Sequence, residues 1–136
     1  MKRSVVAAVG LLASGVALAD NLEGAERLLC APKQITICVE DADCYPAHGS
    51  ELGVPDFFIV DLKNKKVQTT KGSEQTRTTA FSSVSRNGGK IFLQGVESGR
   101  AFSFLINEAT GSLTVAVSRD GVAVAAFGSC TNAKVE

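Results

Sequence analysis

Residues 87–121 read NGGKIFLQGVESGRAFSFLINEATGSLTVAVSRDG, and they contain four regularly spaced turn signals. Four turns end in Gly89, Gly99, Gly111 and Gly121, which are spaced by 10, 12 and 10 residues. Glycine accepts the positive φ that tight hairpin turns require, and the segments between the turns are rich in β-branched and aromatic residues. The spacing therefore predicts an antiparallel meander of short strands.

Alternation of apolar and polar residues supports the meander and extends it in both directions. Leu113, Val115 and Val117 alternate with hydroxyl residues and alanine, so this segment buries one face. The chain as a whole predicts a mainly β fold of about eight strands, at 34–40, 56–62, 66–71, 76–85, 90–97, 100–107, 112–118 and 122–129. Sequential hairpins favour a small barrel with a filled interior, and a bent sandwich is the alternative.

The N-terminal part of the domain predicts a different element. Leu22, Ala25, Leu28 and Leu29 recur at helical spacing in residues 21–30, with Asp20 or Asn21 available as a cap. We expect a short N-terminal helix that packs on the sheet or plugs one end of the barrel. It would help to cover residues 56–62 and 122–127, which are apolar on both faces, whereas residues 41–55 read as a long loop.

The first residues have the features of an export signal. Lys2 and Arg3 precede an apolar stretch over residues 4–18, and Ala17-Leu18-Ala19 matches the small-x-small pattern before a cleavage site. We expect a cleaved signal peptide at 1–19, with a membrane anchor as the alternative, and one domain at 20–136. Because the remaining chain holds no apolar run of about 18 residues, no membrane span is expected in the mature protein. The predicted location is the periplasm, or the outside, of a Gram-negative cell.

Four cysteines, Cys30, Cys38, Cys44 and Cys130, lie in the expected mature chain. An even number in an exported protein predicts disulfides, and four cysteines allow three connectivities. We favour Cys38–Cys44, which closes a small loop, and Cys30–Cys130, which joins the start of the domain to its end. The chain has no Cys-x-x-Cys pair, so neither a zinc knuckle nor a thioredoxin-like redox motif is indicated.

Composition limits the classes of function. Lys and Arg number 14 and so do Asp and Glu, a balance that disfavours a dedicated nucleic-acid binder. Without residues 1–19 the net charge is −2, with −6 over residues 20–60 and +5 over residues 61–100. One His, one Tyr and no Trp leave little material for imidazole catalysis or a histidine metal site.

For several candidate sites, a purely structural explanation of the residues is stronger than a functional one. Asp41 and Asp43 have carboxylates at alternate positions, which suits a hard cation, but the pattern of a calcium-binding loop is absent. His48 and Ser50 are too close in sequence to indicate a catalytic triad. Lysines cluster around residues 63–71 without interleaved aromatics, so we interpret them as surface and edge-protecting residues.

Two family resemblances rest on the C-terminal half. Residues 100–104 (RAFSF), 107–111 (NEATG) and 127–131 (FGSCT), which end in Gly-x-Cys-Thr, resemble a group of small exported β-proteins of proteobacteria. That resemblance implies a shared fold and no catalytic or binding residue. Residues 98–102 (SGRAF) are similar to the Ser-Gly-x-x-Tyr segment of periplasmic inhibitors of c-type lysozyme, which are disulfide-linked β-barrels. The lysine-bearing segment that follows in that family is absent here.

The sequence thus favours a non-enzymatic binding domain for a protein or another component of the cell envelope. The alternatives are a carrier of a small apolar ligand within the barrel and, third, an envelope hydrolase. No catalytic residue, metal site or cofactor is assigned, and the sequence does not predict an oligomeric state.

Overall fold

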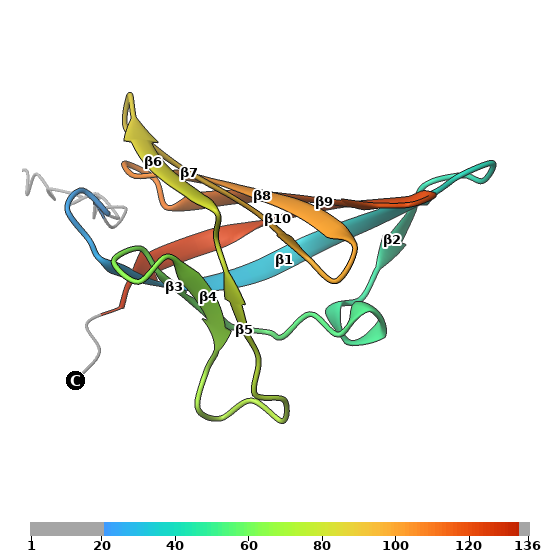
Figure 1. Ribbon diagram of the computed structural model, residues 1–136, viewed down its shortest axis with the longest axis horizontal. Helices are drawn as coiled ribbons and strands as arrows, with labels where there is room; N and C mark the ends of the chain where they lie inside the picture. The colour runs from blue at the N-terminus through green and yellow to red at the C-terminus, as the bar shows by residue number, and fades with distance from the viewer. Residues whose placement is uncertain (1–20, 134–136) are drawn as a thin grey trace, which may run out of the picture.

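The computed structural model describes residues 21–133, and they form one antiparallel sheet of ten strands that curls into a half-barrel (Figure 1). The predicted signal peptide at 1–19 lies outside the described residues. The elements are β1 (Arg27–Val39), β2 (Tyr45–Ala47), the 3-10 helix η1 (Gly49–Leu52), β3 (Phe58–Asp61), β4 (Lys66–Thr69), β5 (Thr78–Ala80), β6 (Ser83–Asn87), β7 (Lys90–Glu97), β8 (Arg100–Asn107), β9 (Ser112–Arg119) and β10 (Val122–Asn132).

Strands β6 to β10 form the predicted meander, in which each strand pairs with the next along the chain. β7 and β8 have the bounds that the turn spacing predicts. Between them Ser98 and Gly99 both have positive φ, 49° and 74°, which matches the right-handed twist of the strands that they connect. Mainly β, antiparallel structure is therefore confirmed, and the meander is its most regular part.

The predicted N-terminal helix is wrong. Residues 21–26 form turns in which Gly24 has a φ of 74°, and β1 begins at Arg27. Leu28 and Cys30 are buried with a period of two, as alternate side chains of a strand are, and β1 pairs with β3 on one side and with β10 on the other. These two neighbours bind the backbone groups of β1 along both edges, and this pairing outweighs the helical spacing of the leucines.

The strand predicted at 76–85 is two strands that belong to opposite edges of the sheet. β5 pairs with β4, whereas β6 pairs with β7. Between them the Phe81 amide donates to the Lys65 carbonyl oxygen at 2.8 Å, and the Ser82 amide donates to the Gln94 carbonyl oxygen at 2.8 Å. The chain thus crosses from one edge to the other, and this crossing folds the sheet into a half-barrel. β2, a strand containing Pro46, lies in the segment that was predicted to be a loop.

The interior of the half-barrel is filled by side chains. Phe58, Phe81, Phe102 and Phe104 form an aromatic cluster with ring centroids 5.5 to 6.0 Å apart. Leu28, Ile91, Leu93 and Ile106 are fully buried around it. Burying each such aliphatic side chain contributes about 1.5–3 kcal/mol, so the burial of these four residues stabilises the half-barrel.

Two disulfides join the chain, Cys30–Cys130 and Cys38–Cys44, and no cysteine is free. These are the pairs that the sequence favours. Cys30 and Cys130 face each other across β1 and β10 and lie 100 residues apart in sequence. Cys38–Cys44 closes the short turn after β1. Such bonds indicate an oxidising, extracellular type of compartment.

Candidate functional sites on the half-barrel

The residues that the sequence offered for chemistry do not come together. Asp41 and Asp43 are exposed in the turn that Cys38–Cys44 closes, and Asp41 has a positive φ of 61°. Within residues 21–133, no group of three or more His, Cys, Asp or Glu side chains is placed to hold a metal ion. His48 is exposed at the start of η1, and Ser50 lies within that turn of helix.

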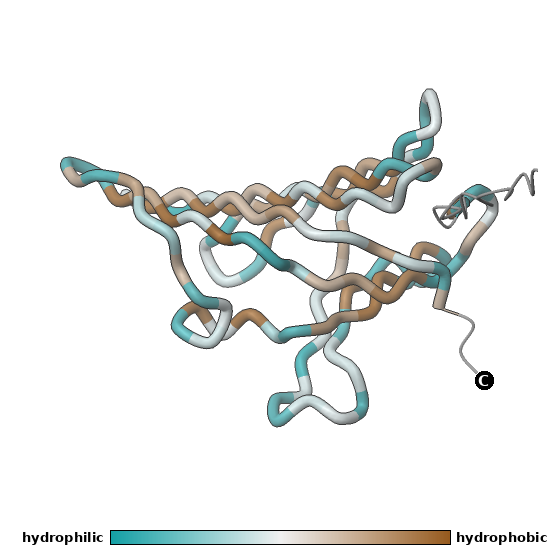
Figure 2. The backbone as a smooth tube through the Cα atoms, turned by 180° about the vertical axis from the view of Figure 1, so that it is seen from behind, coloured by the Kyte–Doolittle hydropathy of each residue, from teal (hydrophilic) through white to brown (hydrophobic). Residues whose placement is uncertain are grey.

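The side of the meander that faces away from the core is an unusual surface. We call it the outer face and define it by the outward positions of four strands: Lys90, Phe92, Gln94 and Val96 on β7, Ala101, Ser103, Leu105 and Asn107 on β8, Ser112, Thr114, Ala116 and Ser118 on β9, and Ala123, Ala125 and Phe127 on β10. Lys90, at one end, is the single charged residue among them. In Figure 2 the hydrophilic colour gathers instead at the turns at the ends of these strands.

Large apolar side chains are exposed on this face. Val96 is 75% exposed, Phe127 is 49% exposed and Phe92 is 36% exposed. Phe92 pairs with Leu105, which is next to Thr114 and then Phe127 across the strands, so these residues form one row across the sheet. The sequence predicted that β10 would be covered on both sides, yet the described chain leaves the outer side of Phe127 open.

Apart from Lys90, the charged residues of the meander strands lie on the inward register. Glu97 and Arg100 face each other across β7 and β8, in line with the inward positions of those strands. Arg86 pairs with the buried Ile91, and Arg119 continues the inward series of Leu113, Val115 and Val117. The charges therefore sit at the ends of the half-barrel and leave the outer face almost uncharged.

Small side chains make the middle of the outer face shallowly hollow. A depression of about 570 Å³ crosses it and is lined mainly by Ala101, Ser103, Ala116, Ser118, Ala123 and Ala125. Gly95, Phe102, Val117 and Val124, from the inward register, also border it. The short outward side chains leave the backbone between them within reach of a partner.

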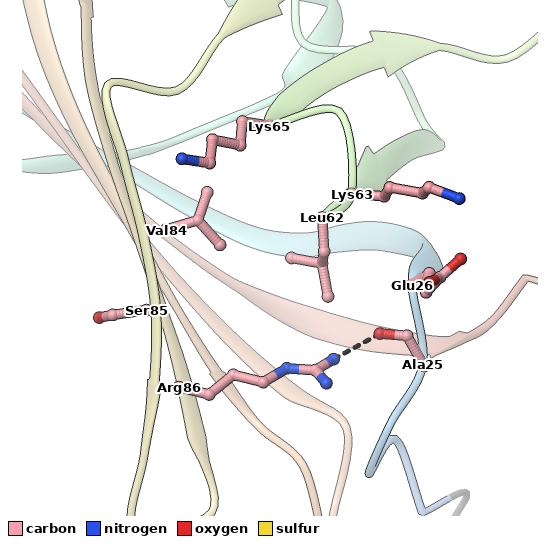
Figure 3. Close-up of a pocket in the computed structure, with 8 residues that line it drawn as sticks. All are labelled: Ala25, Glu26, Leu62, Lys63, Lys65, Val84, Ser85 and Arg86. Carbon is pink, nitrogen blue, oxygen red and sulfur yellow. Dashed lines mark hydrogen bonds between the residues drawn. The ribbon is translucent and has the colours of Figure 1, made fainter.

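A second depression of about 410 Å³ lies where the half-barrel does not close, between β6 and the turn after β3 (Figure 3). We call it the edge window and define it by Ala25, Leu62, Lys63, Lys65, Val84 and Arg86. The Arg86 guanidinium spans its lower end, because Nη2 donates to the Ala25 carbonyl oxygen and Nε lies 3.3 Å from Glu108 Oε1.

Among residues 21–133 two carboxyl groups have clearly shifted pKa values, and both shifts are downward. Burial of Asp61 raises its pKa, but the hydrogen bonds from the side chain and backbone of Asn64 and the charges of Arg27 and Lys66 outweigh it, so the pKa of Asp61 is lowered. Hydrogen bonds from Arg77 and Thr79 lower the pKa of Glu97. A general acid needs a raised pKa, so neither group has the shift expected of one.

No family model, curated protein or solved structure matches this chain. The geometry of the outer face and the edge window therefore carries the functional argument alone. None of the helices among residues 21–133 is long and apolar enough to cross a membrane.

Sequence reasoning named neither surface. For the outer face the signal was present: residues 101–107, 112–118 and 123–127 carry no charge at their outward positions. The edge window had no signal in the sequence, because it is formed by residues from three separate segments of the chain, 25–26, 62–65 and 84–86.

Proposed function

We propose that this chain is a non-enzymatic binding domain that contacts a protein of the cell envelope through its outer face. One observation carries the proposal: the outward positions of four adjacent strands expose Phe92, Val96 and Phe127 and include one charge, Lys90. Interface cores are depleted in charge and enriched in aromatic residues, whereas the exposed face of a monomeric sheet is normally polar.

The remaining features support binding over catalysis or transport. The aromatic cluster fills the interior, which leaves the space inside the half-barrel unsuited to an apolar cargo. The two shifted carboxyl groups, Asp61 and Glu97, have partners that stabilise their charged forms. An exposed apolar sheet face in contact with water favours association, because burying it removes apolar area from water.

The location belongs to the same proposal. We infer that the signal peptide at 1–19 is removed and that the domain acts in the periplasm or outside the cell, where its disulfides persist. A partner with an uncharged, mainly apolar surface would meet the outer face without leaving buried charges unpaired.

A charge placed in the middle of the outer face tests the proposal. Ala116 is exposed at the centre of β9, so we expect Ala116→Glu to fold normally and to lose capture of an envelope protein from extract. Thr78→Glu adds the same charge at an exposed strand position on β5 and is the matched control. With the captured protein in hand, hydrogen exchange should show slowed amides on β7 to β10.

Two results would contradict this function. One is a partner that binds wild type, Ala116→Glu and Thr78→Glu equally well, because that partner would use another surface. The other is a homodimer in sedimentation that Ala116→Glu dissociates, because the outer face would then be occupied by a second copy of the chain.

A further inference from the structure

The edge window is a gap in the wall of the half-barrel with definite ends. β6 pairs with β7 on one side, and in the described chain no strand pairs with its other side. That free edge faces the turn at residues 62–65. The Phe81 amide bound to the Lys65 carbonyl oxygen closes one end, and Arg86 bound to the Ala25 carbonyl oxygen closes the other.

The floor of the window is apolar. Leu62 and Val84 are partly exposed while they pack against the core, and Ala25 is buried beside them. Figure 3 shows Leu62 pointing into the opening from one side and Val84 approaching it from β6. Ser85 points away from the opening, so the lining from β6 is Val84 and Arg86.

The rim is cationic, and neither of its lysines, Lys63 and Lys65, forms an ion pair within residues 21–133. Lys65 extends across the opening toward Val84 (Figure 3). The ion pairs among residues 21–133 are Arg77–Glu97 and Arg86–Glu108, so the ammonium group of Lys65 has no carboxylate within ion-pair distance there. Lys63 and Glu26 both lie on the far rim and point away from the opening.

We propose that the edge window binds an amphiphilic anion, with an alkyl chain against Leu62 and Val84 and an anionic head beside Lys65. The chemistry of the lining requires both parts: the floor gains from covering apolar area, and the free ammonium gains from an opposite charge. A volume of about 410 Å³ suits a small ligand, because ligand pockets hold about 300–1,000 Å³. This site is separate from the outer face.

The closed ends favour this occupant over an added peptide strand. An extended peptide that pairs with a sheet edge must continue past both ends of its contact. Here the Phe81–Lys65 and Arg86–Ala25 contacts bridge the window within the six residues from 81 to 86, so a strand has no path along β6. A single alkyl chain enters from the open side and needs no such path.

Titration with four probes tests the ligand class. We expect decanoate, below its micelle-forming concentration, to shift backbone amide signals at residues 62–66 and 84–86. Decanol supplies the chain without charge, acetate supplies the charge without chain, and decyltrimethylammonium reverses the charge. Decanol should bind about two- to fivefold more weakly than decanoate, because it lacks the contact with the exposed Lys65, and decyltrimethylammonium should bind more weakly than decanol. Acetate should bind at least about tenfold more weakly than decanoate, because it lacks the alkyl chain.

A lysine substitution tests the site. Lys65 has a positive φ of 51°, so Lys65→Asn suits the backbone and removes the charge. We expect decanoate to bind this variant about two- to fivefold more weakly, whereas Lys71→Asn, in an exposed turn outside the lining of the window, should bind as wild type does. Vesicles containing anionic lipid, compared for the same two variants, distinguish a membrane source of the ligand from a free carboxylate.

Three results would overturn the proposal. The first is decanol that binds as tightly as decanoate, which would remove the role of Lys65. The second is a set of shifted amides on β7 to β10, which would place the ligand on the outer face. The third is equal weakening of binding by Lys65→Asn and Lys71→Asn, which would make the effect one of net charge.

Discussion

The two halves of the sheet are built in different ways. In the meander, β6 to β10, every strand pairs with its neighbour in sequence across a turn of a few residues. The N-terminal half, β1 to β5, also contains the sequential pairs β1–β2, β3–β4 and β4–β5, but its central strand β1 pairs with β10 and β3. Cys30 of β1 is bonded to Cys130, which is 100 residues away in sequence. Local pairs cost little chain entropy to form, whereas distant pairs must close long loops. The meander should therefore be the more autonomous half, and the N-terminal half should depend on its long-range bonds.

Removing the long disulfide should have the largest effect on stability, and it should affect the N-terminal half more than the meander. We expect the double variant Cys30→Ala, Cys130→Ala to lose about 2–5 kcal/mol of unfolding free energy in urea. In the variant Cys38→Ala, Cys44→Ala the two cysteines are only 6 residues apart. Its loss of unfolding free energy should be about 2 kcal/mol smaller than the loss in the Cys30, Cys130 variant. Hydrogen exchange should then become faster in β1, β3 and β4 before β7 and β8. Equal losses in the two variants would contradict the dependence on long-range bonds.

A glycine at the junction of the halves should have the next largest effect. A Cβ on Gly128 of β10 would overlap the carbonyl oxygen of Ala31 on β1, next to the irregular pairing at Pro32. We expect Gly128→Ala to cost about 2–3 kcal/mol, because backbone must move to admit the methyl group. Gly72, with no atom near its Cβ position and no positive φ, is the control and should be neutral. Thermal unfolding of both variants measures the difference.

The same contrast explains what could be predicted from the sequence. The bounds of β7 and β8 follow from turn glycines and alternation, which are local signals. β1 was predicted to begin as a helix because Leu22, Ala25 and Leu28 have helical spacing, and only its pairing with β3 and β10 makes it a strand. The division of residues 78–87 into two strands is also set by distant partners, Lys65 and Gln94.

The functional surfaces divide in the same manner. The outer face could have been found in the sequence, because it is the uncharged register of three successive strands. The edge window could not, because Leu62, Val84 and Ala25 meet only when the half-barrel curls. Local sequence patterns thus specify the outer face of the meander. The edge window is specified by the long-range topology, which brings separate segments of the chain together.

Asp61 stabilises a local turn within the N-terminal half. Its carboxylate accepts hydrogen bonds from the backbone and the side chain of Asn64, both at 2.9 Å, and so holds the turn from β3 to β4. We expect Asp61→Asn to cost about 1 kcal/mol at pH 7, since the charge-assisted part of these bonds is lost. Chemical denaturation of both proteins measures this cost.

The pH dependence of that cost has a definite sign. The pKa of Asp61 is lowered in the folded chain, so its contribution to stability is complete above the unfolded pKa, near about 4. It is lost as the pH falls through the lower, folded pKa. The stability gap between wild type and Asp61→Asn should therefore be constant from pH 5 to 7 and narrow below pH 4. A gap that stays constant to pH 2 would mean that the carboxylate charge is not responsible.

The smallest effect should come from an exposed ion pair between the two halves, on the side away from the β1–β10 pair. Arg77, just before β5, places its Nη2 atom 2.9 Å from Oε2 of Glu97 on β7. Thr79 Oγ1 donates to the same oxygen atom at 2.8 Å. Both charged side chains are partly exposed, at 47% and 33%, so solvent screens the pair and Arg77→Ala should cost about 0.2–1 kcal/mol. Salt should remove most of that difference.

The location of the loss is more informative than its size. If the halves are distinct, Arg77→Ala should speed hydrogen exchange in β5 and leave β7 unchanged, because β7 keeps its pairs with β6 and β8. Thr79→Val, which removes the other bond to Glu97, should act on the same amides. Faster exchange throughout β7 and β8 would show that the meander relies on this contact, and the two halves would then unfold as one unit.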